Sequence, residues 1–297
     1  MISLKFLGTS FALPTKDRSH TAILLTYKGE NILIDCGEGT QRQFRKANLN
    51  PCKITRILIT HVHGDHILGL PGIMQTLSLS GYNKTLFIYG PRGIKKFMKN
   101  LLKTFVFDLN YKIKVEEVDG KFFENDDFYL ESKKMIHGVP CNAYSFVKKG
   151  QRRIEKKKLA KSGLPSSELL RKLKEGKNVI YEGKKYLAKN MTFVEDGKKV
   201  SFVLDTLYND RIVPFVKNSD LLVCGVTFDS ELKDKAKEKK HLTAEQGGII
   251  AKKSKSKRLI LTHISQRYEK DNSKLLKDAK KHFKNSKIAN DFDSFEV

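Results

Sequence analysis

The heptad THVHGDH, residues 60 to 66, constrains this chain more than any other stretch of its sequence. It places three of the chain's eight histidines and one aspartate within six residues. The preceding residues, Ile54 to Thr60 (ITRILIT), form a short apolar run rich in β-branched residues, which is typical of a buried strand. Residues Ile67 to Ser80 predict a helix. The cluster therefore follows a strand's carboxyl end, where open α/β sheets place their active sites.

The spacing inside the heptad favours metal binding. Residues two apart on an extended segment point the same way, so His61 and His63 can hold one cation together. Gly64 lets the backbone turn sharply, so Asp65 and His66 face another direction and can serve a second cation. Imidazole suits zinc and similar transition metals, and a carboxylate adds a hard ligand. A polar loop with unrelated histidines is the alternative, but it does not account for so dense a cluster directly after an apolar strand.

Three further potential ligands follow predicted strands elsewhere in the chain. His137 comes after ESKKMI, Asp205 after VSFVL and His263 after RLILT. Each alone is better explained as a structural residue, but four strands that end in a ligand type can converge at one edge of a sheet sandwich. The predicted ligands are His61, His63 and His137 for one ion, Asp65, His66 and His263 for a second, and Asp205 bridging both.

Such a pair of ions indicates phosphate-ester hydrolysis. Two divalent ions about 3.5–4 Å apart clamp the attacking and leaving oxygens of a phosphoryl displacement and make water more acidic. A carboxylate beside that water can orient it or accept its proton, and Asp65 has the right position for this role.

The net charge indicates a polyanionic partner. There are 57 Lys and Arg against 33 Asp and Glu, which gives +24 at pH 7. An excess this large predicts attraction to nucleic acid, although a lysine-rich thermophilic protein is the alternative explanation. The four cysteines are scattered without a CxxC pair, which argues against a zinc ribbon or a disulfide framework.

Much of the charge gathers between residues 148 and 189. The stretch 148–161 (KKGQRRIEKKKLAK) carries eight basic residues and one acidic residue. A solvated linker is the alternative, but the segment is too long and too one-sided in charge to favour it. We therefore predict a single domain over residues 1–297, with an inserted flexible basic arm at 148–189.

Targeting signals are not apparent in this sequence. No apolar run approaches the roughly 18 residues that span a bilayer. The N-terminal residues MISLKFLGTSF lack a basic region followed by an apolar one, as in a secretory signal. The sequence predicts a soluble, cytoplasmic protein without a membrane partner.

Several motifs besides the heptad occur in a fixed order along the chain. They are Gly8-Thr9-Ser10, P-x-K-x-R from Pro14, DCGEGTQ from Asp35, HGVP from His137, Asp205-Thr206, His241-Leu242-Thr243 and H-x-S-x-R-Y from His263. In this order and spacing they resemble the short-form tRNA 3′-processing endonucleases (ribonuclease Z) of the metallo-β-lactamase superfamily. The resemblance covers essentially the whole chain. It departs at Leu204, where many members have glycine, and at Ile264, where an aromatic residue is common.

The resemblance implies the α/β metallo-β-lactamase fold, an αββα sandwich with a protruding basic arm that binds tRNA. It implies a zinc-dependent endoribonuclease that removes 3′ trailers from tRNA precursors, leaving a 3′-hydroxyl on the tRNA and a 5′-phosphate on the trailer. The implied cofactors are two Zn²⁺ per subunit, with Mn²⁺ or another divalent ion as an alternative. The implied assembly is a homodimer in which one subunit's arm holds precursor tRNA for the other's site.

The resemblance also implies roles for individual residues. The seven predicted ligands keep the division given above. Asp65 is the expected proton acceptor, and His241 is the expected proton donor to the leaving 3′ oxygen. The expected substrate-binding residues are Lys16, Arg18, Glu38, Thr40 and Arg267.

Two other functions compete with this one. A metallo-β-lactamase-fold phosphodiesterase or thioesterase acting on small substrates would share the metal site, but it has no need of a basic arm. An RNA-binding module with a vestigial site would keep the charge, but loss of function usually erodes a ligand set, and this one is complete.

Overall fold

The computed structural model describes all 297 residues. The chain folds into two compact units. Unit 1 comprises residues 1–123, 130–146 and 199–297, and unit 2 comprises residues 124–129 and 147–198. None of the helices combines the length and the apolar character needed to cross a membrane.

The first large sheet has seven strands in the order β18-β1-β2-β3-β4-β5-β6. Strands β1 to β3 pair antiparallel, and β3 to β6 run parallel. The parallel strand β4 is buried along its whole length, as expected for a strand covered on both faces. The strands are β1 (Ile2–Gly8), β2 (Ala22–Tyr27), β3 (Glu30–Ile34), β4 (Arg56–Leu58), β5 (Leu86–Gly90), β6 (Ile113–Glu117) and β18 (Ser294–Glu296).

The second large sheet also has seven strands, in the order β17-β16-β15-β14-β9-β8-β7. Strands β14 to β17 run parallel, so the residues after their carboxyl ends gather at one edge. The strands are β7 (Gly120–Glu124), β8 (Phe128–Met135), β9 (Cys141–Lys148), β14 (Lys198–Val203), β15 (Leu221–Gly225), β16 (Leu259–Thr262) and β17 (Ser286–Ile288).

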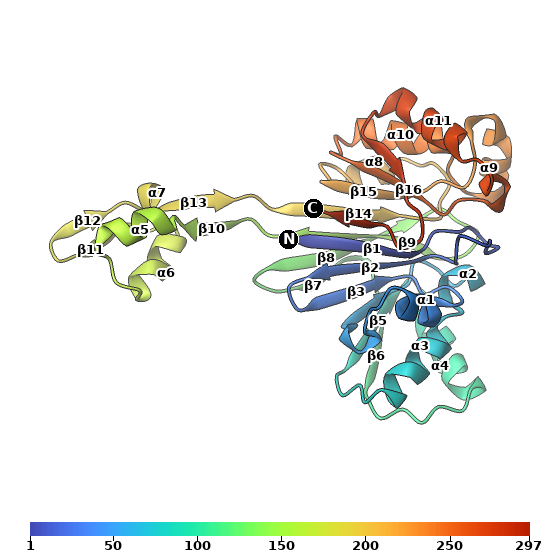
Figure 1. Cartoon of the computed structure of the whole chain (residues 1–297), viewed down its shortest axis with the longest axis horizontal. Coiled ribbons are helices and arrows are strands. Elements are labelled where there is room, and N and C mark those ends of the chain that lie inside the picture. Colours follow the sequence, from blue (N-terminus) through green and yellow to red (C-terminus); the bar gives the residue numbers. More distant parts are fainter. The chain divides into compact units, whose positions relative to one another are not determined.

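Helices cover the outer faces of both sheets (Figure 1). Against the first sheet lie α1 (Thr40–Lys46), α2 (Gly64–Ile67), α3 (Leu70–Leu79) and α4 (Ile94–Thr104), and against the second lie α8 (Ile212–Phe215), α9 (Lys233–Lys239), α10 (Ala244–Lys253) and α11 (Ser273–His282). The inner faces meet where Tyr144 donates its hydroxyl to the carbonyl oxygen of Ile59 at 2.7 Å. This layering confirms the predicted αββα sandwich.

The heptad begins in the loop after β4 and continues into α2, which starts at Gly64. The strand predicted from Ile54 to Thr60 is observed only as the shorter β4, and beyond its end the backbone N–H of Thr60 donates to Asp35 Oδ1 at 2.7 Å. The predicted helix from Ile67 to Ser80 is split into α2 and α3. Gly69 lies at the break and packs so closely on the backbone of Gly37 that a β-carbon there would clash.

Unit 2 is a small folded module with an apolar cluster of its own. Strand β10 (Gln151–Ile154) pairs antiparallel with β13 (Thr192–Glu195), and β11 (Val179–Tyr181) pairs with β12 (Lys184–Tyr186). The helices are α5 (Lys156–Ser162), α6 (Glu168–Lys174) and α7 (Ala188–Met191). Buried apolar side chains hold these elements together: Leu164, Leu173, Val179, Tyr186, Ala188 and Met191. The segment 148–189 falls within this unit and therefore contains packed secondary structure.

Candidate metal centre

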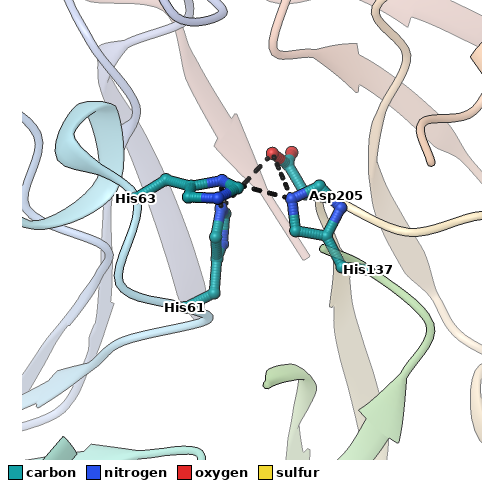
Figure 2. A group of neighbouring side chains, drawn as sticks. All are labelled: His61, His63, His137 and Asp205. Atoms are coloured by element: carbon teal, nitrogen blue, oxygen red, sulfur yellow. Dashed lines mark hydrogen bonds and ion pairs between the residues drawn. The ribbon is translucent and has the colours of Figure 1, made fainter. Parts of the chain in front are cut away.

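Four of the side chains predicted as ligands converge in one group, which Figure 2 shows. His61 and His63 follow β4, and His61 Nε2 lies 3.0 Å from His63 Nδ1. His137 follows β8, and its Nε2 lies 3.2 Å from the same His63 nitrogen. Asp205 follows β14 and completes the group, whose ligand atoms all lie within 4.8 Å of one another.

A second group lies beside the first and contains Asp65, His66 and His263. The Nε2 atoms of His66 and His263 are 3.1 Å apart, and each lies 3.4 Å from Asp65 Oδ2. Asp65 and His66 belong to α2, whereas His263 follows β16, nearly 200 residues later in the chain. The fold therefore brings together donors from both large sheets.

Asp205 lies between the two groups. Its Oδ2 is 3.6 Å from His61 Nε2 and 3.5 Å from His66 Nε2. Its Oδ1 lies 3.0 Å from His263 Nδ1 but makes no hydrogen bond, although it is fully shielded from solvent. Burial alone raises the pKa of Asp205, but the charges of the surrounding histidines, His263 first, outweigh it and lower this pKa well below the usual value. Asp205 is therefore an ionised carboxylate that faces both groups.

These residues fit a divalent metal site. His63 Nδ1 lies 3.0 Å from His61 Nε2 and 3.2 Å from His137 Nε2, and a single proton can join it to only one of these two nitrogens, whereas one cation can bind all three lone pairs. Burial also lowers the pKa of His61 well below its usual value, and the neutral imidazole is the metal-binding form. The buried Asp205 Oδ1 without a hydrogen bond is the kind of atom that a cation would satisfy.

Asp35 supports the cluster from behind, although the sequence predicts no role for it. Its Oδ2 accepts a hydrogen bond from His66 Nδ1 at 2.6 Å and another from the Thr60 hydroxyl at 2.7 Å. This assigns the proton of His66 to Nδ1 and turns the Nε2 lone pair toward the cluster. Both Asp35 and His263 have a positive φ, 56° and 61°, a strained conformation that often marks functional sites. The only sequence signal for Asp35 was its place at the head of DCGEGTQ.

His241 lies at the edge of the cluster. Its Nδ1 is 3.8 Å from Asp205 Oδ2 and 3.4 Å from the hydroxyl of Thr227, which also lies 3.2 Å from His263 Nδ1. His241, Asp205 and His263 form a third group of possible ligands. Burial lowers the pKa of His241 to about 4, and an arriving phosphate anion would raise it again. Thr227 is a second residue that sequence reasoning missed, because no motif marks it.

The predicted substrate-binding residues have different environments. Lys16 and Glu38 are exposed and line a cavity of about 260 Å³. Arg18 is buried, and its guanidinium donates at 2.7 Å each to Thr9 Oγ1, the Ala289 carbonyl and Asn290 Oδ1. It holds its own loop in place and does not face solvent. Thr40 is buried and donates to the Gly37 carbonyl at 2.7 Å, whereas Arg267 is exposed at the rim of another cavity.

Known proteins resemble this chain over nearly its whole length. A ribonuclease Z from Nanoarchaeum equitans is 41% identical over 263 residues, which is 89% of this chain and 83% of that protein. The crystal structure of human tRNase Z, short form, superposes with a TM-score of 0.72 at 27% identity and 99% coverage of both chains. The metallo-β-lactamase fold protein YhfI from Bacillus subtilis superposes with a TM-score of 0.73 at 20% identity, covering 100% of this chain and 99% of that one. A family described as anti-Pycsar protein Apyc1 matches residues 2–137.

Proposed function

This chain belongs to the ribonuclease Z family, and we propose that it is a cytoplasmic, zinc-dependent endoribonuclease that removes 3′ trailers from tRNA precursors. The observation that carries the proposal is the double cluster of His and Asp side chains, in a chain that matches a ribonuclease Z over most of its length. The cluster suits two Zn²⁺ per subunit. One would be held by His61, His63 and His137, the other by Asp65, His66 and His263, with Asp205 shared.

Divalent ions in such a site act as Lewis acids on a phosphoryl oxygen and make water a nucleophile near neutral pH. The protein's own part begins at Asp65, whose side chain is 12% exposed and so reachable from solvent. The backbone N–H of Ala12 donates to Asp65 Oδ2 at 2.9 Å and holds this carboxylate in position. Asp65 would accept the proton of the attacking water as its oxygen bonds to phosphorus.

His241 would complete the reaction on the other side of the phosphate. The bond from phosphorus to the 3′ oxygen breaks, and His241 gives that oxygen a proton. The tRNA then ends in a 3′-hydroxyl, and the trailer begins with a 5′-phosphate. The hydroxyl of Thr227 contacts both His241 and His263, so it would fix the orientation of the two rings.

The remaining roles concern substrate binding. Unit 2 would be the flexible arm that grips tRNA, and the subunits would form a homodimer so that each arm serves the partner's site. Lys16, Glu38 and Arg267 would line the path of the RNA near the metal centre, and the buried Thr40 would act indirectly by holding the Gly37 carbonyl in its turn. Arg18 would act indirectly, because its three buried hydrogen bonds position the loop that carries Lys16.

The direct test is to incubate the metal-loaded protein with a 3′-extended tRNA and to map the cut by gel and end-group analysis. We expect one cut near the end of the mature tRNA, with a 3′-hydroxyl on the tRNA and a 5′-phosphate on the trailer. Hydrolysis of small phosphodiesters or thioesters without any cut in the precursor would favour the small-substrate alternative instead.

Metal removal should abolish this activity. Dialysis against a chelator should eliminate cleavage, and added Zn²⁺ should restore it with two ions bound per chain, measured by elemental analysis. Reloading should also raise the Tm, because a ligand at about 100 times its Kd stabilises the folded state by about 2.7 kcal/mol. Full activity in the metal-free protein, or saturation at one ion per chain, would contradict the two-ion site.

A further inference from the structure

A small cavity beside the metal centre has an aromatic wall and a basic rim. Its volume is about 210 Å³, below the roughly 300–1,000 Å³ of pockets that enclose a drug-sized ligand, so it suits a single ring system. The lining side chains that matter are Phe11, Leu13, Phe228, Lys235, Lys239 and Arg267.

Phe11 connects this cavity to the proposed chemistry. Its ring centroid lies 5.0 Å from that of His241 and 5.2 Å from that of His263, both edge-on. The next residue, Ala12, donates its backbone N–H to Asp65 at 2.9 Å. The hydrogen bond of Ala12 therefore links this loop to Asp65, the proposed base. The ring contact of Phe11 links it to His241, the proposed acid.

The chemistry of the lining matches a nucleotide. The Phe228 ring lies 6.3 Å from Phe11, and the Arg267 guanidinium lies 5.3 Å from the Phe228 centroid. Phe228 itself is buried and backs the cavity, so the partly buried Phe11 ring and the exposed Arg267 guanidinium are the planar groups open to a base. Aromatic rings and guanidinium groups are the surfaces on which unpaired bases stack. The exposed Lys235 and Lys239 supply positive charge at the rim for phosphate groups.

We infer that this cavity binds the nucleobase of the last nucleotide retained on the tRNA, the one whose 3′ oxygen is the leaving group. This inference rests on the proposed function and deepens it. The contact between the Phe11 ring and His241 indicates that this nucleotide lies on the tRNA side of the cleaved bond, because His241 is the proposed donor to the leaving 3′ oxygen. Stacking tolerates every base, so the cavity serves tRNAs that differ at this position.

The test combines variants with modified substrates. Phe11→Leu removes the ring, and Phe11→Tyr keeps it; Phe11 is only partly buried, so both proteins should fold. The substrates are a 3′-extended tRNA, the same RNA abasic at its last retained nucleotide, and the same RNA abasic at the first trailer nucleotide. Phe105→Leu, an exposed phenylalanine outside this cavity, is the matched control.

We expect Phe11→Leu to lower kcat/KM about 10- to 100-fold on the normal precursor, the range of base–aromatic stacking. On the RNA abasic at the last retained nucleotide, the variant and the wild type should differ less than about twofold, because the partner of the ring is already missing. Phe11→Tyr, which keeps the ring, should recover most of the loss caused by Phe11→Leu, and Phe105→Leu should match the wild type on all three substrates.

An equal loss on the normal RNA and on the RNA abasic at the last retained nucleotide would overturn the inference and make Phe11 a structural support for His241. Coupling only to the first trailer nucleotide would overturn the side of the cut that we assign. Both outcomes leave the proposed function intact, whereas a wild-type protein that cuts no precursor at all overturns that function together with this inference.

Discussion

Asp65→Ala should lower kcat for precursor tRNA at least about 10³-fold while leaving the Kd for tRNA within about threefold. The substitution removes both the proposed proton acceptor, a group typically worth about 10²–10⁴ in rate, and one proposed metal ligand. Asp65 makes no more than a small part of the RNA-binding surface, since its side chain is 12% exposed. Single-turnover cleavage and a filter-binding titration measure the two effects separately.

The exposed carboxylate of Asp210 offers a matched control, because it lies outside the cluster. Asp210→Ala should cleave at the wild-type rate. Metal content per chain distinguishes the two possible causes of the Asp65→Ala effect, loss of the proton acceptor and loss of a metal ligand. A variant that keeps both ions has lost mainly the proton acceptor. If Asp65→Ala cleaves as fast as wild type, the assignment of this residue is wrong.

Removal of the arm should weaken tRNA binding roughly 100-fold at 0.1 M salt. Ile154 lies directly opposite Thr192 in the β10–β13 pair, so Asn-Gly can replace residues 155–191 and close a two-residue hairpin. The removed stretch carries eleven Lys and Arg against four Glu, a net charge of +7. Loss of two charge-assisted contacts of about 1.5 kcal/mol each gives a change of this size.

The salt dependence of tRNA binding distinguishes a loss of phosphate contacts from a loss of shape complementarity. The slope of log K against log salt should become shallower by about 0.7–0.9 for each phosphate contact removed. Hydrolysis of bis(p-nitrophenyl) phosphate, if the wild type shows it, should be spared. An equal loss of both activities would contradict an arm role.

A charge reversal tests the arm without deleting it. Lys156, Lys157 and Lys158 are exposed on α5, and changing all three to Glu should weaken tRNA binding as well. The matched control reverses Lys95, Lys96 and Lys99 on α4, which are equally exposed but lie in unit 1. Equal weakening by both triple variants would mean that the protein binds RNA by its overall charge.

The amino-acid sequence already indicated the residues that the structure brings together. Short apolar runs predict strands, and a His or Asp directly after a strand has a defined place at the sheet edge. For that reason His137, Asp205 and His263 could be grouped with the heptad, although His263 lies 202 residues after His61 in the chain.

Contacts between distant loops could not be predicted in the same way. The buried support that Asp35 gives to His66 depends on a positive φ and on a 2.6 Å hydrogen bond across 31 residues. Arg18 is predicted to bind substrate, but its side chain is buried and donates to Ala289 and Asn290 in the C-terminal part of the chain. The charge of segment 148–189 predicts a flexible arm, whereas its sparse apolar residues meet only when unit 2 folds.

The properties of the heptad therefore have two different physical origins. Its ligand types and their alternation along one extended segment are local properties, so they can be deduced from seven letters. The distances between its nitrogens and those of His137 and His263, the position of Asp205 between the two groups and the aromatic cavity beside His241 are set by packing two sheets together. Packing depends on the whole chain at once, so only the tertiary structure decided them.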